Sequence, residues 1–273
     1  MVRVLRATLT TFGILRAHRC LLRIKIVHSH FSKRISESFK WIMSDTEYSN
    51  FYYELTDISL ENLAQSTAAI CRIPVVEIDR YFEELLNDKE LARHIESGFQ
   101  LINVGKDSTV AYGRRIVWYA IIRALKPKIV VETGVEHGVG ACVITSALLR
   151  NQSEGFLGRY IGTELNEKSG TLLSGGYASV GQIYFGDSIE TLSRLEEKID
   201  VFINDSSHDS NYEFREYLAI SNKLGSKAII LGDNAHASTS LSSFSRQFNR
   251  NFVFLPEQPS NHWYSGGGVG ISY

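Results

Sequence analysis

The sequence has few cysteines, no long apolar run and no surplus of charge of one sign. Its three cysteines, Cys20, Cys71 and Cys142, are far apart and form no CxxC pair or other metal-ligand spacing, which favours a reducing compartment and a cytoplasmic location. No run of about 18 uncharged apolar residues occurs, so a membrane-spanning helix is not expected. A formal net charge of −1 gives no general attraction to phosphates, and no nucleic-acid partner is expected.

Charge is unevenly distributed at the amino terminus. Residues 1–43 contain nine Lys or Arg and one acid, Glu37, whereas residues 44–100 contain twelve acids and four bases. A basic, acid-poor segment with interspersed apolar residues is typical of a targeting peptide or of a helix that lies on an anionic membrane surface. It also fits a basic helix that packs on the acidic stretch. The sequence leaves these three readings open, and with them a weak membrane-surface contact through residues 1–43.

The spacing of apolar residues changes near residue 112. Before it, residues such as Ile78, Phe82 and Leu85 recur at helical spacing, so residues 44–111 are expected to form several helices with a turn at Gly105. After it, short apolar runs alternate with amphipathic segments, as in a mostly parallel sheet covered by helices. We therefore predict a basic segment (1–43), a helical region that caps a substrate or contacts a second copy in a homo-oligomer (44–111), and an α/β core (112–273).

Seven strands and four helices can be placed in the core. The strands are expected at residues 128–132, 160–165, 182–185, 200–204, 227–231, 252–255 and 269–273. The helices are expected at residues 114–125, 139–150, 212–224 and 240–250, and Gly225 is expected to end the third. The predicted fold class is α/β, a doubly wound, mostly parallel seven-stranded sheet with an N-terminal helical extension.

A glycine-rich turn connects the first expected strand to the next helix. The segment reads Glu132-Thr133-Gly134-Val135-Glu136-His137-Gly138-Val139-Gly140. Glycine permits positive φ and close approach of a ligand to the backbone. The segment is neither a GxGxxG dinucleotide fingerprint nor a P-loop with a terminal Gly-Lys-Ser/Thr. It resembles the first motif of the Rossmann-like, S-adenosylmethionine-dependent methyltransferases, which implies that Glu132, Gly134, Gly138 and Gly140 hold the cofactor. A glycine cluster in another α/β protein is the alternative.

Further polar residues stand at the ends of the next two strands. Glu164 ends the second strand, where a carboxylate can accept both hydroxyls of a ribose. Asp187 and Ser188 follow the third strand, where the methyltransferase resemblance implies a contact with the adenine edge. Because ligands of open α/β sheets bind at the carboxyl ends of the strands, these residues form one consistent set.

The fourth and fifth strands lead into Asp205 and into Asp233-Asn234. On neighbouring strands, about 4.8 Å apart, two unpaired carboxylates repel by about 3 kcal/mol at an effective dielectric constant of about 20, which a divalent cation would remove. Oxygen ligands of this kind suit Mg²⁺. The arrangement resembles the metal site of catechol and caffeoyl-coenzyme A O-methyltransferases, and the surrounding sequence resembles the cephalosporin hydroxylase and macrocin O-methyltransferase type. The alternative is that both aspartates are strand-end caps.

His208 lies three residues after Asp205, where the catechol enzymes carry a lysine base. An imidazole near neutrality can accept a proton, which makes His208 a candidate catalytic residue. A solvent-facing histidine at a helix start is the alternative. Asp205 is a second candidate catalytic residue and is also expected to contact the cofactor. His236 and the run His262-Trp263-Tyr264 are expected as wall or lid residues, and a structural role for Trp263 and Tyr264 is the alternative.

Together these residues predict methyl transfer from S-adenosylmethionine to a hydroxyl of a small-molecule acceptor, a sugar or secondary metabolite, with help from Mg²⁺. Two alternatives remain open at this point. One is a metal-independent N- or O-methyltransferase, and the other is a non-catalytic nucleotide-binding protein of the same fold.

Overall fold

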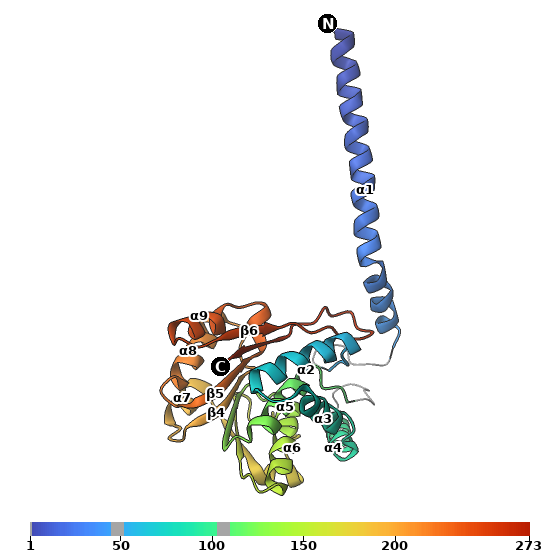
Figure 1. Ribbon diagram of the computed structural model, residues 1–273. Helices are drawn as coiled ribbons and strands as arrows, with labels where there is room; N and C mark the ends of the chain where they lie inside the picture. The colour runs from blue at the N-terminus through green and yellow to red at the C-terminus, as the bar shows by residue number, and fades with distance from the viewer. Residues whose placement is uncertain (1, 45–51, 103–109) are drawn as a thin grey trace. The chain divides into compact units, whose positions relative to one another are not determined.

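The computed structural model describes residues 2–44, 52–102 and 110–273 (Figure 1), so the turn expected at Gly105 lies outside the described residues. The chain divides into two compact units. One comprises residues 1–45 with 261–263, and the other comprises residues 46–260 with 264–273. The three-part division at residues 43/44 and 111/112 stays a prediction.

The smaller unit is built on one long helix, α1 (Val2–Ile42). Near its end the Trp41 ring lies 5.6 Å from the His262 ring and 5.9 Å from the Trp263 ring, measured between centroids. Lys40 in the last turn complements the negative end of the helix dipole. Within the described parts of the chain, none of the helices combines the length and apolar character needed to cross a membrane. The basic segment is therefore helical, and its role stays a prediction.

Three helices open the larger unit, as the apolar spacing predicts. They are α2 (Asp57–Cys71), α3 (Val75–Leu86) and α4 (Lys89–Ile102). The side chain of Thr56 caps α2 by accepting a hydrogen bond from the backbone N–H of Ser59. Ile78, Phe82 and Leu85 form one buried stripe along α3, because residues three and four apart share a helix face.

The core is a seven-stranded sheet in the order β3-β2-β1-β4-β5-β7-β6. Its strands are β1 (Ile129–Thr133), β2 (Arg159–Glu164), β3 (Gly181–Phe185), β4 (Ile199–Asn204), β5 (Leu224–Gly232), β6 (Phe252–Leu255) and β7 (Val269–Ser272). The first five strands pair in parallel, whereas β7 runs antiparallel to both β5 and β6. The predicted fold class is confirmed.

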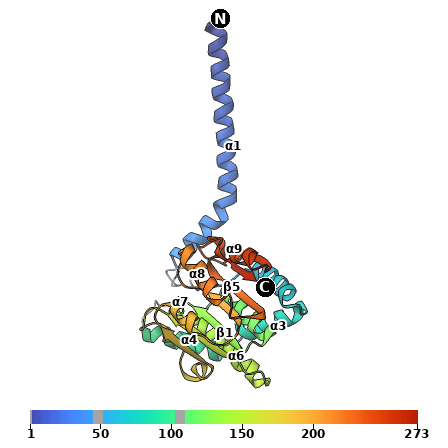
Figure 2. The same cartoon turned by 90° about the vertical axis from the view of Figure 1, so that its left-hand side faces the viewer.

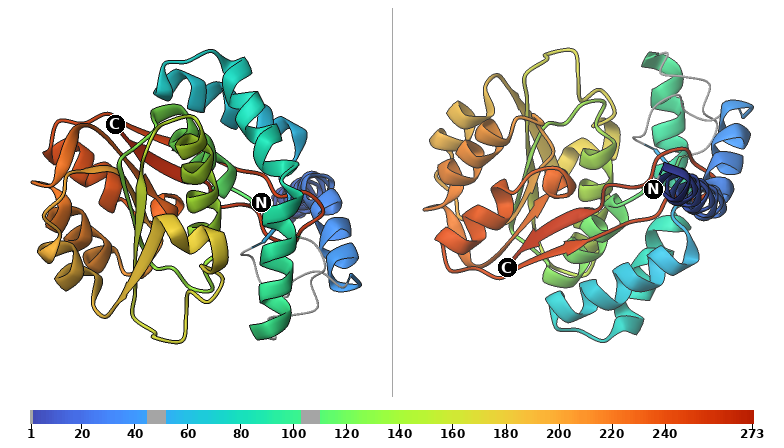
Figure 3. Two further views of the ribbon diagram at one scale, coloured as in Figure 1. Left: turned by 90° about the horizontal axis from the view of Figure 1, so that it is seen from below. Right: turned by 90° about the horizontal axis from the view of Figure 1, so that it is seen from above.

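Helices cover both faces of this sheet (Figure 3). The α5 (Arg115–Leu125) and α6 (Val139–Ser153) helices pack together on one face, and the three helices α7 (Ser188–Arg194), α8 (Ser210–Ile220) and α9 (Ser240–Gln247) lie side by side on the other (Figure 2). Successive strand residues point to opposite faces. Val130 therefore joins the core beneath α5 and α6, and Val131 joins the core beneath α8 and α9.

The predicted ends of three helices, at residues 150, 224 and 250, differ from the observed ends at Ser153, Ile220 and Gln247. The helix expected at 212–224 ends at Ile220, and Gly225 lies in β5 instead of capping it. The backbone N–H of Ile199 donates to the carbonyl of Lys223 at 2.9 Å, and Ile199 pairs with Leu224. This pairing with β4 draws the chain into the sheet early, so tertiary contacts override the local helical pattern. No helix was predicted where α7 lies, between the third and fourth strands.

The sheet order places a topological switch between β1 and β4. From β1 the chain crosses to β2 and β3 on one side, whereas β4 and β5 lie on the other. Adjacent crossovers leave a crevice at the carboxyl ends of such strands, and this is where ligands bind in open α/β sheets.

Candidate active site

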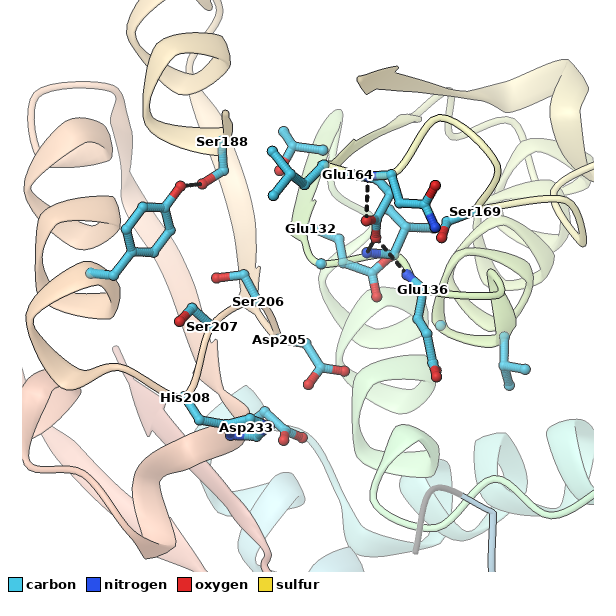
Figure 4. Close-up of a pocket in the computed structure, with 18 of the residues that line it drawn as sticks. Glu132, Glu136, Glu164, Ser169, Ser188, Asp205, Ser206, Ser207, His208 and Asp233 are labelled. Carbon is cyan, nitrogen blue, oxygen red and sulfur yellow. Dashed lines mark hydrogen bonds between the residues drawn. The ribbon is translucent and has the colours of Figure 1, made fainter. Parts of the chain in front are cut away.

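A cavity of about 820 Å³ opens at the carboxyl ends of the parallel strands. Most of the residues singled out from the sequence line it: Glu132, Gly134, Gly140, Glu164, Asp187, Ser188, Asp205, His208 and Asp233, together with His236 and Tyr264. Figure 4 shows Asp205 near the middle of the group, with Glu132 and Glu164 to one side and His208 beside Asp233. Gly138 and Asn234 are not part of the lining.

The glycine turn needs glycine at three positions. Gly138, at the N-cap of α6, has φ +102°, which favours glycine. Gly134 has φ +80°, and a Cβ there would lie 2.6 Å from the Cα of Ser206 on the neighbouring strand end. Gly140 has an ordinary helical conformation, but its Cβ would press against the carboxylate of Glu132 and lie 3.1 Å from the Trp118 ring. The turn thus packs tightly against the end of β4 and against α5, and this packing fixes the position of its residues that line the cavity.

Glu132 is a buried carboxylate beneath that turn. It is 1% exposed, and the hydroxyl of Tyr160 donates a hydrogen bond to its Oε2. Burial raises the pKa of Glu132 to about 7, against the opposing effects of the Tyr160 hydrogen bond and of Arg115.

Glu164 is held by neutral backbone groups. Its Oε2 accepts hydrogen bonds from the backbone N–H of Val135 at 3.1 Å and of Glu136 at 2.9 Å, and its Oε1 accepts one from Asn166 at 2.9 Å (Figure 4). A carboxylate has about four lone-pair positions and three are used here, so Glu164 retains about one for a ligand hydroxyl.

Asp187 and Ser188 stand at the start of α7. The Oδ1 of Asp187 caps the helix by accepting from the backbone N–H of Glu190 at 3.0 Å, and its Oδ2 accepts from the hydroxyl of Tyr212 at 2.9 Å. Ser188 donates to Oε1 of Glu216 at 2.5 Å. The structure therefore brings both residues to the cavity, with Tyr212 as a lining residue that sequence reasoning missed.

Glu216 fixes the loop that follows β4. Its Oε2 accepts hydrogen bonds from Asn204 Nδ2 and from Ser206 Oγ, both at 2.6 Å, and burial raises the pKa of the carboxyl. Because Ser206 follows Asp205 directly, this anchor sets where Asp205 enters the cavity.

Asp205 and Asp233 are not the unpaired carboxylates that the metal prediction assumed. Asp233 accepts a hydrogen bond from Nε of Arg114, and Asp205 Oδ2 lies 3.9 Å from Nη2 of Arg115. β4 and β5 are neighbours as expected, and the two acids influence each other. Burial and the charge of Asp233 raise the pKa of Asp205, whereas Arg114 holds the pKa of Asp233 below its usual value despite burial.

Sequence reasoning missed both arginines, although a signal for them exists. Arg114 and Arg115 stand at the start of α5, whose first turn contains no acid. Two cations at the positive end of a helix dipole are unfavourable unless acids from elsewhere neutralise them. The pair therefore points to buried carboxylates that approach from other elements.

Asn234 contacts His208 instead of the cavity. Its Nδ2 donates to the carbonyl of Ser207 at 3.2 Å, which orients the amide so that its Oδ1 faces Nδ1 of His208. Because an amide oxygen only accepts, Nδ1 of His208 carries the proton in this hydrogen bond. The other ring nitrogen, Nε2, is then the basic one.

These partners decide whether the residues fit a magnesium ion, and they do not. Mg²⁺ needs ligand oxygens at about 2.1 Å in octahedral geometry. One predicted ligand, Asp233, is bound to a guanidinium, which would repel the ion, and another, Asn234, uses its oxygen for His208. Among the residues that the structure describes, no three His, Cys, Asp or Glu side chains form a cluster that could hold a metal.

Comparison with known proteins places these features in a family context. Residues 131–235, which contain the glycine turn, Glu164, Asp187, Asp205 and Asp233, match the family model described as a methyltransferase domain. The match spans 105 of the 273 residues and confirms the resemblance predicted from the glycine turn. A search among curated proteins finds no match.

Solved structures show the same fold. The SAH-bound methyltransferase PaMTH1 of Podospora anserina is 18% identical, with a TM-score of 0.51 over 71% of this chain and 92% of that protein. A methyltransferase of Geobacter sulfurreducens is 16% identical, with a TM-score of 0.50 over 72% of this chain and 95% of that protein. At these identities the likeness concerns the fold alone.

Proposed function

We propose that the methyltransferase domain transfers a methyl group from S-adenosylmethionine to a hydroxyl of a small molecule. The observation that carries this proposal is the position of Glu164, whose carboxylate is tied to the glycine turn by backbone hydrogen bonds and lines the cavity. A cavity of this volume is in the range that encloses a small ligand.

One end of the cavity suits the cofactor. Glu164 would accept a hydrogen bond from the ribose, Asp187 and Ser188 would bind the adenine, and the turn at Gly134 with Glu132 would hold the amino-acid half. When bound, the cofactor supplies an electrophilic methyl group on a sulfonium. We call this group of residues (Glu132, Gly134, Glu164, Asp187 and Ser188) the cofactor end.

The other end suits the acceptor, and we call Asp205, His208 and Asp233 the acceptor end. With Nδ1 bound to Asn234, Nε2 of His208 is the atom that would take a proton. Nε2 of His208 would accept the proton that the acceptor hydroxyl loses when it is methylated. A base at this place favours an acceptor that must lose a proton, as a hydroxyl must.

The sequence left open a Mg²⁺-assisted and a metal-independent methyltransferase. The hydrogen bonds of Asp233 with Arg114 and of Asn234 with His208 favour the metal-independent one. Help from Mg²⁺ would require Arg114 to leave Asp233 and His208 to leave Asn234. The protein's own task is to align the acceptor and accept its proton.

Titration calorimetry with S-adenosylmethionine and with its demethylated product tests the cofactor end. We expect binding that weakens about 5-fold to 150-fold in Glu164→Ala, or about 1–3 kcal/mol, since the lost hydrogen bonds involve a charged group. Glu167→Ala is the matched control, because Glu167 is exposed and does not line the cavity. Tight NADH binding with no response to the methyl donor would rule the proposal out. Cofactor binding without turnover of any hydroxylated acceptor would favour the non-catalytic alternative.

A further inference from the structure

Three segments far apart in the sequence meet at Arg114. The residue follows Gly113, whose φ of +51° and close approach to the Tyr53 ring, 2.9 Å for an added Cβ, leave no room for a side chain. The backbone N–H of Gly113 donates to the carbonyl of Tyr53 at 3.1 Å. This tight turn aims the Arg114 side chain between the end of β5 and the loop after β6.

The guanidinium of Arg114 has acidic or phenolic partners on two of its nitrogens. Nε donates to Asp233, and Nη1 donates to the hydroxyl of Tyr53 at 2.8 Å and to Oε1 of Glu257 at 3.2 Å. Glu257 is held in turn by Tyr53, whose hydroxyl donates to it at 2.5 Å, and by the backbone N–H groups of Gly267 and Gly268, both at 3.0 Å. We call Arg114, Tyr53, Asp233 and Glu257 the arginine clamp.

The clamp is nearly dry. The side chains of Glu257, Asp233 and Arg114 are 0%, 3% and 11% exposed. In such surroundings charges must be balanced by neighbouring charges, because water cannot do so. The neighbouring Arg115 guanidinium, 8% exposed, faces Asp205.

Arg114 and Arg115 supply two positive charges at this place, the same total charge as one divalent cation. They face the carboxylates of Asp205 and Asp233 on adjacent strands, and Arg114 also pairs with Glu257. A guanidinium also donates hydrogen bonds in a fixed plane, so Arg114 sets the direction of the Asp233 carboxylate.

We propose that Arg114, assisted by Arg115, takes the place of a divalent cation between Asp205 and Asp233. The wild-type protein then binds no Mg²⁺ or Mn²⁺ at this place, and removal of Arg114 creates a metal-binding site. That catalysis needs no metal rests on the proposed function, whereas the absence of metal binding at Asp205 and Asp233 does not.

The probe is Mn²⁺ alone, added to the full chain and followed by the paramagnetic resonance signal of the free ion. For the wild type we expect the signal of free Mn²⁺ to persist, with a dissociation constant weaker than about 1 mM. For Arg114→Met, which keeps an unbranched apolar stem and removes the guanidinium, we expect binding at least about tenfold tighter. Asp233→Asn in the Arg114→Met background should abolish this gain.

Arg80→Met is the matched control, because Arg80 is an exposed arginine that pairs with Glu77 on α3. It should gain no binding. Circular dichroism establishes that each variant is folded, and where Arg114→Met is not, Arg115→Met serves as the second variant, with the same expected gain, at Asp205. Micromolar Mn²⁺ binding by the wild type that is lost in Asp233→Asn would overturn the proposal, and so would a folded arginine variant that gains nothing.

The activity arm separates this proposal from the proposed function. Turnover that persists in a chelator supports a metal-free site, whereas turnover abolished by the chelator and restored by Mg²⁺ overturns it. A protein that binds no S-adenosylmethionine refutes the proposed function and leaves the Mn²⁺ result intact.

Discussion

At the cofactor end a carboxylate is held by neutral backbone N–H groups, whereas at the acceptor end carboxylates are held by guanidiniums. Glu164 accepts three backbone hydrogen bonds and keeps its negative charge available to a ligand. Asp233 and Glu257 both pair with Arg114, so these two carboxylates already have a cationic partner within the protein. The carboxylate of Glu164 can therefore bind a ligand, whereas the carboxylates of Asp233 and Glu257 hold elements of the protein together.

The largest effect expected from this comparison concerns stability. Arg114→Met leaves Asp233 and Glu257 buried without a cation, and we expect a loss of about 3–5 kcal/mol in the free energy of unfolding. Denaturant titration measures it, with Arg80→Met, an exposed ion pair worth at most about 1 kcal/mol, as the control. Adding Glu257→Gln to Arg114→Met should recover part of the loss. A variant as stable as the wild type would mean that the clamp carries no stability.

The next effect concerns rate. We expect His208→Ala to lower kcat by about 10²-fold to 10⁴-fold, the usual range for a positioned base. Its affinity for S-adenosylmethionine should be unchanged, because the cofactor end lies on other strands. His28→Ala, on the exposed surface of α1, is the control. Equal losses of cofactor affinity and rate would place His208 in cofactor binding instead.

A pH dependence should come from the cofactor end. The pKa of Glu132 is raised to about 7 by burial, from a reference value of 4.5. Its neutral form favours the folded state, so this contribution is complete below pH about 4.5 and is lost as the pH rises through about 7. Glu132→Gln should remove it, with a difference on the order of 3 kcal/mol between pH 4.5 and pH 8. Unfolding titrations across this range measure the slope, and an unchanged slope would contradict the assignment.

The smallest effect is expected from shortening the chain at its amino terminus. Removal of residues 1–43 should leave S-adenosylmethionine affinity unchanged, because the residues that line the cavity all lie beyond that segment. Sedimentation with anionic vesicles should show less binding for the shortened chain, if the basic helix contacts membranes. A shortened protein that no longer folds would make α1 part of the folded core.

The two ends of the cavity also differ in how well the sequence predicts them. The cofactor end depends on short-range features, a strand, a glycine turn and a helix, and Glu132, Gly134 and Glu164 line the cavity as expected. The arginine clamp depends on pairs separated by 61 and 143 residues along the chain. Nothing in local spacing tells which acid meets which base over such distances.

Asn234 shows a second limit of the sequence. An amide oxygen beside Asp233 fits a metal ligand and a hydrogen-bond acceptor for His208 equally well, because both roles use the same atom. The choice is made by the neighbouring carbonyl of Ser207, which fixes the amide's orientation. The strand positions followed from short apolar runs, whereas the early end of α8 at Ile220 followed from pairing of the next segment with β4.

The bridge between Leu55 and Pro259 bears on how the protein forms during synthesis. Hydrogen bonds from Thr56 to Gln258 at 3.0 Å and from Ser260 to Glu54 at 2.7 Å extend it, and Tyr53 reaches Glu257 across 204 positions of sequence. Contacts of such long range form slowly, since a large loop must close first. We therefore expect the strands from β1 to β4, with the cofactor end, to assemble on the ribosome before Glu257 joins the arginine clamp. A nascent chain halted before residue 250 would then already acquire part of its cofactor crevice, yet would lack Glu257, the partner of Tyr53 and Arg114.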